Sequence, residues 1–261
     1  MKKTKMKKIT FSIALSVLTF ASFAQKTVLA NGGRFGNQTE NVSVSVYDTQ
    51  TGISTTIDSI GTQSVQDVLV DGNIAFVAAQ DSIVRYDLVS NTRTAAVKFA
   101  GVSTKAMVLG PNNELIVSNW YGRSSNNVYI YNQTTLNLVD SIDFAGGVTT
   151  MLVDAANDVL IVTQNQSSGA PNYSDTLGSI VAASISTRSI IAPLTVTGYT
   201  SGIGELIAKP NGTGAYAFNS GTNTIIDVDV TNFPAITTTL NTSNQNLKVG
   251  SSSHYEVNGD T

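Results

Sequence analysis

The sequence predicts an all-β fold, a β-propeller built of four-stranded antiparallel blades. Three observations predict it: a unit of four short apolar strands recurs, turn-forming residues separate the strands, and the composition favours strands. Thr, Ser, Asn, Val and Ile are abundant, good helix formers are sparse, and only 13% of the residues are charged. The chain is therefore expected to consist of strands and turns throughout its folded part.

The repeated unit is clearest at its two middle strands. One is a short apolar strand that ends in a small or polar residue, as in Leu115–Asn119. The next ends in a turn-forming polar residue, as in Ser82–Asp87, and the last residues of its copies lie 39, 45, 52 and 45 residues apart. A period of about 40 to 45 residues is typical of a propeller blade.

Each unit is expected to hold an innermost, a second, a third and an outermost strand, in that order. The innermost strands are predicted at 65–70, 105–109, 149–153, 204–208 and 246–249, and the second strands at 27–31, 74–79, 115–119, 159–164, 215–219 and 254–258. The third strands are predicted at 42–48, 82–87, 127–132, 179–184 and 224–229, and the outermost at 54–60, 94–99, 138–144, 190–196 and 235–240. Turn residues separate innermost from second strands at 71–73, 111–113, 156–158 and 210–212.

Burial explains why such units form a ring. A four-stranded sheet has two faces to cover, and neighbouring sheets around a common axis cover both. A β-sandwich, the main rival, has no need of a fixed period, and a parallel β-helix repeats at shorter intervals. The sequence therefore favours the propeller.

The order of turn, strand ending in Asn, loop, and strand ending in Tyr-Asp-Thr resembles the YVTN/YncE-like repeat family. Tyr47 to Gly52 and Leu115 to Asn119 carry the resemblance, which extends over residues 27–258. It implies a ring of about seven blades in an exported bacterial surface or periplasmic protein. Some similar propellers accompany outer-membrane transporters and bind cobalamin, so the resemblance also implies a corrinoid ligand and a transporter or surface complex as partners.

The residues supply about five blades. The first copy begins at its second strand, and the last supplies only its first two strands. Closure of a five-bladed ring by Val249 onto Thr27 would leave 254–258 as a surplus strand. The chain is therefore expected to be a fragment of a larger ring that ends within a blade.

The N-terminus has the three parts of a secretory signal peptide. Five lysines lie within the first eight residues, an apolar run extends from Ile9 to Phe20, and small residues precede Gln25. The apolar run is too short to span a membrane. Residues 1–24 are predicted to be a signal peptide and 25–261 the propeller domain, in a protein that is periplasmic, on the outer-membrane surface or secreted and not embedded in a membrane.

Removal of this segment makes the chain acidic. It holds five of the 15 Lys and Arg residues and none of the 18 Asp and Glu residues, which leaves a formal net charge of −8. Phosphate binding requires a basic surface, so nucleic acid is not an expected partner.

The sequence favours a protein without catalytic activity. It has no cysteine, and His254 is the only histidine, so a thiol nucleophile and a histidine-rich metal site are both excluded. No nucleotide-binding loop, nucleophile elbow or zinc signature is present, and no cofactor is predicted. Paired carboxylates need no local motif, so a hydrolase or lyase that acts on a glycan or lactone at the channel remains an alternative.

Three long loops are the candidate ligand-binding elements. The loop at 31–40 carries Arg34 and Phe35, that at 119–127 carries Trp120, Tyr121 and Arg123, and the longest, at 165–178, carries Tyr173. Aromatic rings stack on sugars and flat ligands, and arginine donates hydrogen bonds. Because each loop follows a second strand, all three are expected on one face; the alternative is that the aromatic residues only pin the loops.

Two acids occupy matching positions on innermost strands. Asp67 and Glu205 could line the mouth of the channel and bind a hard cation such as Ca²⁺. The other copies place Ala106, Thr150 and Asn246 there, so the alternative is that both acids are satisfied by backbone amides or water.

The sequence leaves three functions open. The first is an exported non-catalytic binding propeller for a glycan, a peptide or a small ligand. The second is the carboxylate-dependent hydrolase or lyase. The third is a structural repeat module of a larger cell-surface protein.

Overall fold

The computed structural model describes residues 26–33, 40–99, 104–119, 127–144, 147–164, 179–195, 203–209, 214–219, 224–229 and 235–241. For residues 192–195, 203–205, 219 and 235–241 it describes the backbone alone. The predicted signal peptide at 1–24 and the predicted strands at 246–249 and 254–258 lie outside these ranges, as does His254. Within the described ranges all regular secondary structure is β-strand, as the composition predicts.

The described strands are numbered in chain order. They are β1 (Lys26–Asn31), β2 (Val42–Asp48), β3 (Ile53–Ile60), β4 (Val65–Asp71), β5 (Ile74–Ala79), β6 (Ser82–Asp87), β7 (Thr92–Lys98), β8 (Thr104–Gly110), β9 (Glu114–Asn119), β10 (Val128–Asn132), β11 (Leu138–Ile142), β12 (Val148–Asp154), β13 (Val159–Gln164), β14 (Ser179–Ser184), β15 (Ser189–Thr195), β16 (Ile203–Ala208), β17 (Gly214–Asn219), β18 (Thr224–Asp229) and β19 (Ala235–Asn241). Each predicted strand within the described ranges is confirmed, with ends that agree within two residues.

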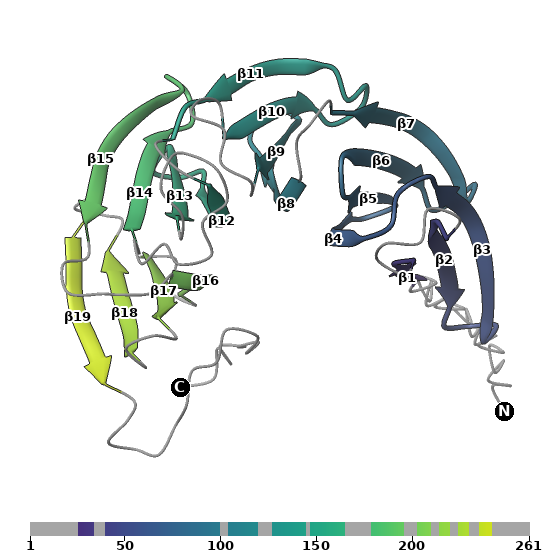
Figure 1. Ribbon diagram of the computed structural model, residues 1–261, viewed down its shortest axis with the longest axis horizontal. Helices are drawn as coiled ribbons and strands as arrows, with labels where there is room; N and C mark the ends of the chain where they lie inside the picture. Colours follow the sequence, from purple (N-terminus) through teal and green to yellow (C-terminus); the bar gives the residue numbers. More distant parts are fainter. Residues whose placement is uncertain are drawn as a thin grey trace, which may run out of the picture.

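Antiparallel pairing joins these strands into five sheets in chain order. The first has the order β1-β2-β3, and the other four, from β4 to β19, each join four consecutive strands. The sheets follow one another around an arc, with β4, β8, β12 and β16 on its inner side and β7, β11, β15 and β19 on its outer side (Figure 1). The predicted four-strand unit is therefore confirmed as a sheet.

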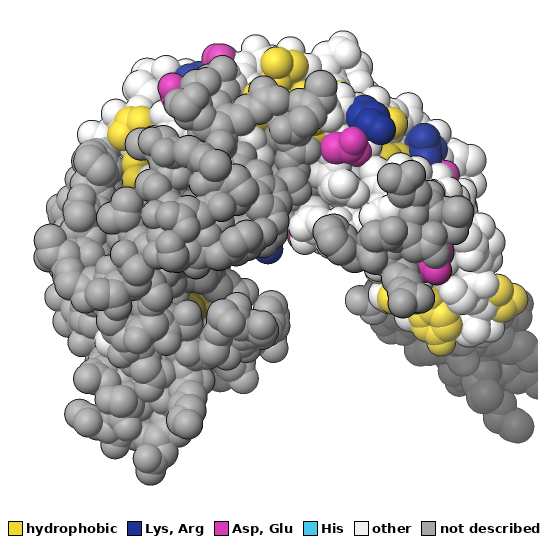
Figure 2. Space-filling model, viewed as in Figure 1, with side chains coloured by type: hydrophobic (Ala, Val, Ile, Leu, Met, Phe, Trp, Pro, Cys, Tyr) yellow, Lys and Arg dark blue, Asp and Glu magenta, His cyan; other side chains and the backbone are white. Residues whose placement is uncertain are grey.

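Hydrophobic side chains lie mainly between the sheets. On the view in Figure 2 they reach the described surface only in small separate groups. In a strand, successive side chains point to opposite faces of the sheet. In the second sheet, Ala75, Val77 and Ala79 of β5 accordingly pack toward the first sheet. Phe76 and Ala78 pack toward the third. Because both faces of the sheet are covered, all five side chains are buried.

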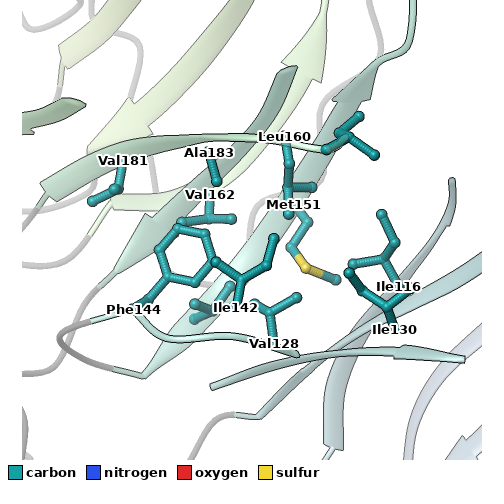
Figure 3. Packing of buried hydrophobic residues seen from close by; sticks show 12 residues of the cluster. Ile116, Val128, Ile130, Ile142, Phe144, Met151, Leu160, Val162, Val181 and Ala183 are labelled. Carbon is teal, nitrogen blue, oxygen red and sulfur yellow. The ribbon is translucent and has the colours of Figure 1, made fainter. Parts of the chain in front are cut away.

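The seam between the third and fourth sheets has the largest of these clusters. Ile116, Ile142 and Phe144 from one sheet pack against Met151 and Val162 from the other, and Figure 3 shows the two sets pointing toward each other. Burial of each such side chain contributes roughly 1.5–3 kcal/mol. Similar clusters fill the other three seams between described sheets.

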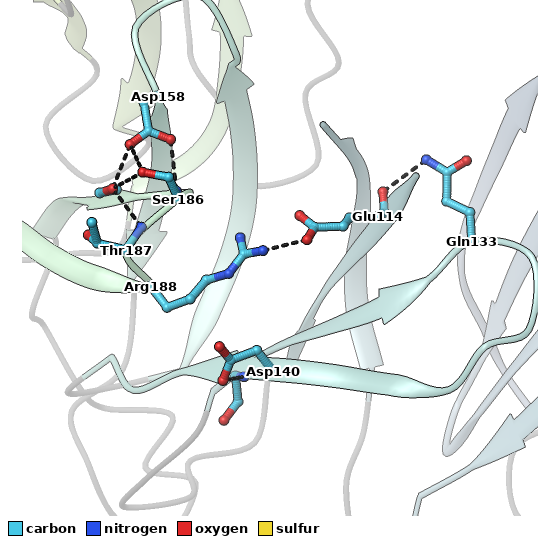
Figure 4. A network of polar contacts seen from close by, with 9 residues as sticks. Glu114, Gln133, Asp140, Asp158, Ser186, Thr187 and Arg188 are labelled. Atoms are coloured by element: carbon cyan, nitrogen blue, oxygen red, sulfur yellow. Dashed lines mark hydrogen bonds and ion pairs between the residues drawn. The ribbon is translucent and has the colours of Figure 1, made fainter. Parts of the chain in front are cut away.

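Charged side chains also cross the seams. Asp58 of β3 accepts hydrogen bonds from the Tyr86 hydroxyl at 2.6 Å and from Arg93 Nε at 2.7 Å, both in the second sheet. Arg188, in the turn between β14 and β15, pairs with Glu114 of β9, and Figure 4 shows this ion pair between the fourth and third sheets. These contacts fix neighbouring sheets relative to one another.

In the first three sheets the turns between third and outermost strands share one local structure. Asp48 Oδ1 accepts the amides of Gln50 and Thr51, and Asp87 Oδ1 accepts those of Val89 and Ser90. Asn132 Oδ1 accepts the amides of Thr134 and Thr135 in the same way. These side chains form Asx turns, which explains why a strand that ends in Asp or Asn recurs in the sequence.

The first sheet has three strands where the others have four. β1 corresponds to β5 and β9, which both pair with an innermost strand, but in the described residues β1 pairs only with β2. This agrees with the prediction that the first copy begins at its second strand. Leu29 and Tyr47, on the face of this sheet away from the second, are 44% and 36% exposed.

The described residues contain no helix that is long and apolar enough to cross a membrane.

Candidate functional site

One face of the arc carries the connections that lead from second to third strands and from outermost strands to the next innermost strand. We call it the long-loop face; it carries the β1–β2, β3–β4, β5–β6, β7–β8 and β9–β10 connections. Hydrogen bonds join these connections across seams: Thr104, at the start of β8, donates from its amide and its hydroxyl to the Gln80 carbonyl, at 2.8 and 3.0 Å. Within the second sheet, the amide of Phe99, just after β7, donates to the Asp81 carbonyl at 2.7 Å. The short Asx turns lie on the opposite face.

All six predicted ligand-binding residues lie outside the described residues. These are Arg34, Phe35, Trp120, Tyr121, Arg123 and Tyr173. The described ends of the 119–127 loop are close, because the Asn119 amide donates to the Asn127 carbonyl at 2.8 Å. Because β1 and β9 hold the same place in their sheets, the loops after them begin at the same face. The roles of the six residues remain predictions.

Asp67 is held by backbone amides. Its Oδ1 accepts the Val68 amide at 2.8 Å and its Oδ2 accepts the Met107 amide at 2.7 Å, which joins β4 to β8 across a seam. Burial raises the pKa of Asp67, although these two amides and the nearby Lys105 oppose the rise. Asp67 therefore fits the alternative to cation binding, in which backbone amides satisfy its carboxylate.

No metal-binding group of three or more His, Cys, Asp or Glu side chains occurs in the part of the chain that the structure describes. The backbone of Glu205 lies in β16, and its side chain is outside the description. Cation binding by Asp67 and Glu205 therefore stays a prediction. The contacts of Asp67 do not support it, because both carboxylate oxygens accept backbone amides.

The long-loop face is hollowed at the seam between the first two sheets. A pocket of about 350 Å³ lies there, between the end of the β1–β2 connection, the β3–β4 connection and the β5–β6 turn. Its lining includes Glu40, Asn41, Thr62, Gln63, Gln80 and Asp81. We call it the seam pocket. Its volume falls at the lower end of the range for small-ligand sites.

Backbone contacts fix the walls of the seam pocket. Val42, at the start of β2, donates to the Thr62 carbonyl at 2.9 Å, and Gln63 donates its amide to Gln80 Oε1 at 3.3 Å. Asp81 accepts the Ser82 hydroxyl at 2.9 Å and pairs with Lys98 at 3.4 Å. The pocket is thus built from three connections that are already joined to one another.

Among the seam-pocket residues only Glu40 lies in a loop that was predicted to bind a ligand, and sequence reasoning missed the others. The pocket residues come from three connections, at 40–41, 61–63 and 80–81, and the second and third of these carry no motif. The signal that could have found them is positional: connections at the same end of neighbouring repeat units are expected to meet on one face.

Comparison with solved structures identifies the architecture. The chain is similar to the β-propeller domain of Cps50 (Swd1) from Myceliophteria thermophila, with 14% identity, a TM-score of 0.56, and coverage of 81% of this chain and 70% of that one. The fold is a β-propeller. Each described sheet is therefore a blade, and the five blades form part of a ring.

Two further solved structures agree with this fold. A chain of the mitotic checkpoint complex matches with 12% identity and a TM-score of 0.61, over 92% of this chain and 76% of that one. Kuenenia stuttgartiensis hydrazine synthase matches with 14% identity and a TM-score of 0.58, over 72% of this chain, which spans 57% of the length of that one. At these identities the likeness shows the fold alone. No protein-family model and no curated protein sequence matches the chain.

Proposed function

We propose that this chain is an exported, non-catalytic binding propeller that holds its ligand on the long-loop face. The observation that carries the proposal is the seam pocket, which hollows that face where the predicted Arg34–Phe35 loop runs into Glu40. Ligand pockets occur preferentially at such junctions between packed units, with a few convergent polar groups.

Several further observations support a binding role. The other two long loops start from second strands and so belong to the same face as the pocket. A similar propeller comes from the mitotic checkpoint complex, a protein assembly, which supports interaction as the general role. A glycan, a peptide or a small ligand is the proposed partner class; a corrinoid, and an outer-membrane transporter or surface complex, follow from the YVTN/YncE-like resemblance. The Asx turns at Asp48, Asp87 and Asn132 support that resemblance.

Export is part of the proposal and rests on the N-terminal pattern of residues 1–24. The proposed destinations are the periplasm, the outer-membrane surface or the medium. When the chain is expressed in a Gram-negative host, the exported protein is expected to begin at Gln25. An N-terminal sequence that still includes the lysine-rich segment would contradict cleavage.

The hydrolase or lyase alternative gains no support from Asp67. Asp67, the described member of the predicted acid pair, accepts two backbone amides and so serves as a contact between blades. We therefore retain the binding role alone.

The test of the binding role replaces Trp120 and Arg123 with alanine, one at a time. Glycans, peptides and corrinoids are screened by tryptophan fluorescence, and any ligand found is measured by calorimetry. Stacking and charge-assisted hydrogen bonds contribute roughly 1–3 kcal/mol each, so each variant should bind about tenfold more weakly or worse.

Val89→Ala is the matched control, because Val89 is 70% exposed in a turn on the opposite face. Its ligand affinity should equal that of the unmodified chain. Unchanged affinity in both the Trp120→Ala and Arg123→Ala variants would place the ligand elsewhere.

A further inference from the structure

The inner edge of the first blade is open among the described strands. In the other four blades the second strand lies between the third strand and an innermost strand, whereas in the described residues β1 pairs with β2 alone. The other edge of β1 therefore presents backbone N–H and C=O groups that no described strand pairs. Such an edge is a template for a further strand.

Apolar side chains lie beside this edge, on the side that faces the second blade. Val28 and Ala30 of β1 and Val65 and Val68 of β4 pack against the hydrophobic cluster of the first seam, and all four are only partly buried. We call the free edge of β1, together with these four side chains, the strand slot.

Val68 is more exposed than the residues at the same place in the next two blades. It lies opposite Val77 of the second strand, and the register places Met107 and Met151 at the corresponding positions. These two methionines are 4% and 6% exposed, whereas Val68 is partly buried. β8 and β12 each pack against the innermost strand of the preceding blade, but β4 has β1 on that side. Val68 therefore keeps apolar surface that a neighbouring strand covers elsewhere.

The repeat itself shows what covers such a place. In each of the other four sheets one antiparallel strand, β4, β8, β12 or β16, pairs with the second strand and ends the sheet on its inner side. A single strand is therefore the partner that fits the slot. Its backbone would pair with β1, and alternate side chains would cover Val65 and Val68.

The opposite face of β1 sets the rest of the pattern. Thr27, Leu29 and Asn31 alternate with the two slot residues of β1 and are exposed. A strand with apolar residues at alternate positions, and polar residues between them, therefore suits both faces.

The strand predicted at 246–249 is too closely tethered to be this partner. From residue 241, at the end of β19, to residue 246 the chain spans at most about 18 Å. Three strand spacings, about 14 Å, already separate β19 from the inner side of its own sheet. The remaining 4 Å or so does not cover the roughly 10 Å between two packed sheets, and the first and fifth sheets form the two ends of the arc (Figure 1).

A second copy of the chain also fits less well. Pairing through its own β1 would bring β2 and β3 of that copy onto the inner side of the arc, where each of the other sheets ends after one strand. The geometry of the slot favours a strand that is not part of a sheet.

We propose that the strand slot binds an extended peptide segment of a partner protein, antiparallel to β1, with apolar side chains at alternate positions that cover Val65 and Val68. The site lies on the inner side of the arc. It goes beyond the binding function proposed above and does not depend on the long-loop face.

A strand of this chain serves as the probe. A fluorescent synthetic peptide with the sequence of residues 103–110, which include β8, is titrated into the full chain, and saturable binding is followed by fluorescence anisotropy. Its control carries Val108→Pro. The Met107 amide points to Asp67 of the preceding blade, so in an alternating strand the Val108 amide points to the paired strand. Because proline lacks this amide, the control should bind about tenfold more weakly or worse. Binding of neither peptide, or equal binding of both, overturns the proposal.

Val68→Thr is the test variant of the chain. Threonine has the shape of valine and adds a hydroxyl to the surface that the peptide should cover, so affinity for the peptide should fall about tenfold. Val139→Thr is the matched control, because Val139 is 55% exposed in β11 on the outer side of the third blade. It should bind the peptide like the unmodified chain. Equal binding by Val68→Thr and the unmodified chain overturns the proposal.

Hydrogen exchange locates the bound peptide. The amides of residues 26–31 should exchange more slowly in its presence, because new backbone hydrogen bonds form along β1. Those of residues 138–142, in β11, should not change. Protection that appears elsewhere and not in β1 overturns the proposal.

The same measurements separate the possible occupants. If β1 is already protected in the chain alone and the peptide fails to bind, another strand fills the slot. Ultracentrifugation then assigns it to a segment of the same chain if the chain is a monomer, or to a second copy if it is a dimer. Either result overturns the proposal.

The outcomes also separate the strand slot from the long-loop face. Trp120→Ala and Arg123→Ala should bind the strand peptide like the unmodified chain. If the peptide binds the slot and no ligand depends on the long-loop face, the binding function fails and the strand slot stands. If a ligand depends on that face and no peptide binds the slot, the reverse holds.

Discussion

One carboxylate, that of Asp58, links the first two blades across the hydrophobic seam between them. Asp58 receives hydrogen bonds from Tyr86, whose side chain is fully buried, and from Arg93, with Arg93 Nη2 also 2.5 Å from Asp58 Oδ2. Burial alone would raise the pKa of Asp58, but hydrogen bonds from Tyr86, Arg93 and Ser59 outweigh it and hold the pKa below its ordinary value. Burial and the neighbouring Asp58 raise the pKa of Tyr86, so its hydroxyl stays a donor.

We expect Asp58→Ala to lower the free energy of unfolding by roughly 1–3 kcal/mol, because the buried Tyr86 hydroxyl loses its acceptor. Tyr86→Phe added to it should restore part of the loss, since no unpaired hydroxyl then remains. Urea unfolding of the two single variants and the double variant measures the coupling. Simple additivity of the two losses would contradict a direct contribution of this hydrogen bond.

Asp58 also makes the stability of the folded chain depend on pH. Because the pKa of Asp58 is lower in the folded chain than in the unfolded one, its contribution is present above the unfolded value of about 3.9. It is lost as the pH falls through the folded value. The unmodified chain should therefore lose more stability between pH 7 and pH 3 than Asp58→Ala does, as measured by urea midpoints; parallel losses would contradict this.

At the scale of elements, the same Asx turn recurs between the third and outermost strands of the first three blades. Asn132 in the third blade does what Asp87 does in the second, because a single side-chain oxygen accepts two backbone amides in both. Charge is therefore not what the turn requires. The requirement is an oxygen at the right distance from the backbone.

We expect Asn132→Asp to keep the stability of the chain and Asn132→Ala to lose roughly 1 kcal/mol, because alanine leaves two turn amides without their acceptor. Midpoints of urea unfolding measure the difference. An Asn132→Ala midpoint equal to that of Asn132→Asp would show that the turn forms without the side chain.

At the scale of the whole molecule, the first blade differs from the others by what lies beside it. Leu29 holds the position of Val77, Val117 and Val162, each of which is buried at a seam with the preceding blade. Leu29 itself is 44% exposed, and Figure 2 shows hydrophobic side chains at the end of the arc that the first blade forms. The strand position that is buried between blades in the second, third and fourth blades is therefore exposed to solvent in the first blade.

We expect Val117→Ala to lower the free energy of unfolding by roughly 1.5–3 kcal/mol, through lost burial and the cavity left behind. Leu29→Ala should lower it by less than about 0.5 kcal/mol, although it removes more atoms, because the side chain is not packed in a seam. Chemical denaturation of both variants gives the comparison. Equal losses would show that Leu29 is covered in solution.

The sequence by itself determined the strands, their period and the turns. Each depends on residues within a few positions of one another: alternation such as Ala75 to Ala79 within one strand, or the oxygen of Asp48 and the amides that follow it. Local patterns of this kind are readable because the interacting groups are neighbours in the chain. The same reasoning placed the long loops on one face.

Only the tertiary structure decided which groups meet across the seams. Asp58 and Tyr86 lie 28 residues apart in the sequence, and Glu114 and Arg188 lie 74 apart. The residues around one member of each pair do not indicate which distant residue it contacts. Asp67, predicted as a cation ligand from its repeat position, accepts amides from its own blade and the next. The seam pocket arises in the same way: curvature of the ring brings three connections together, and that curvature is set by packing between blades and not by any one segment.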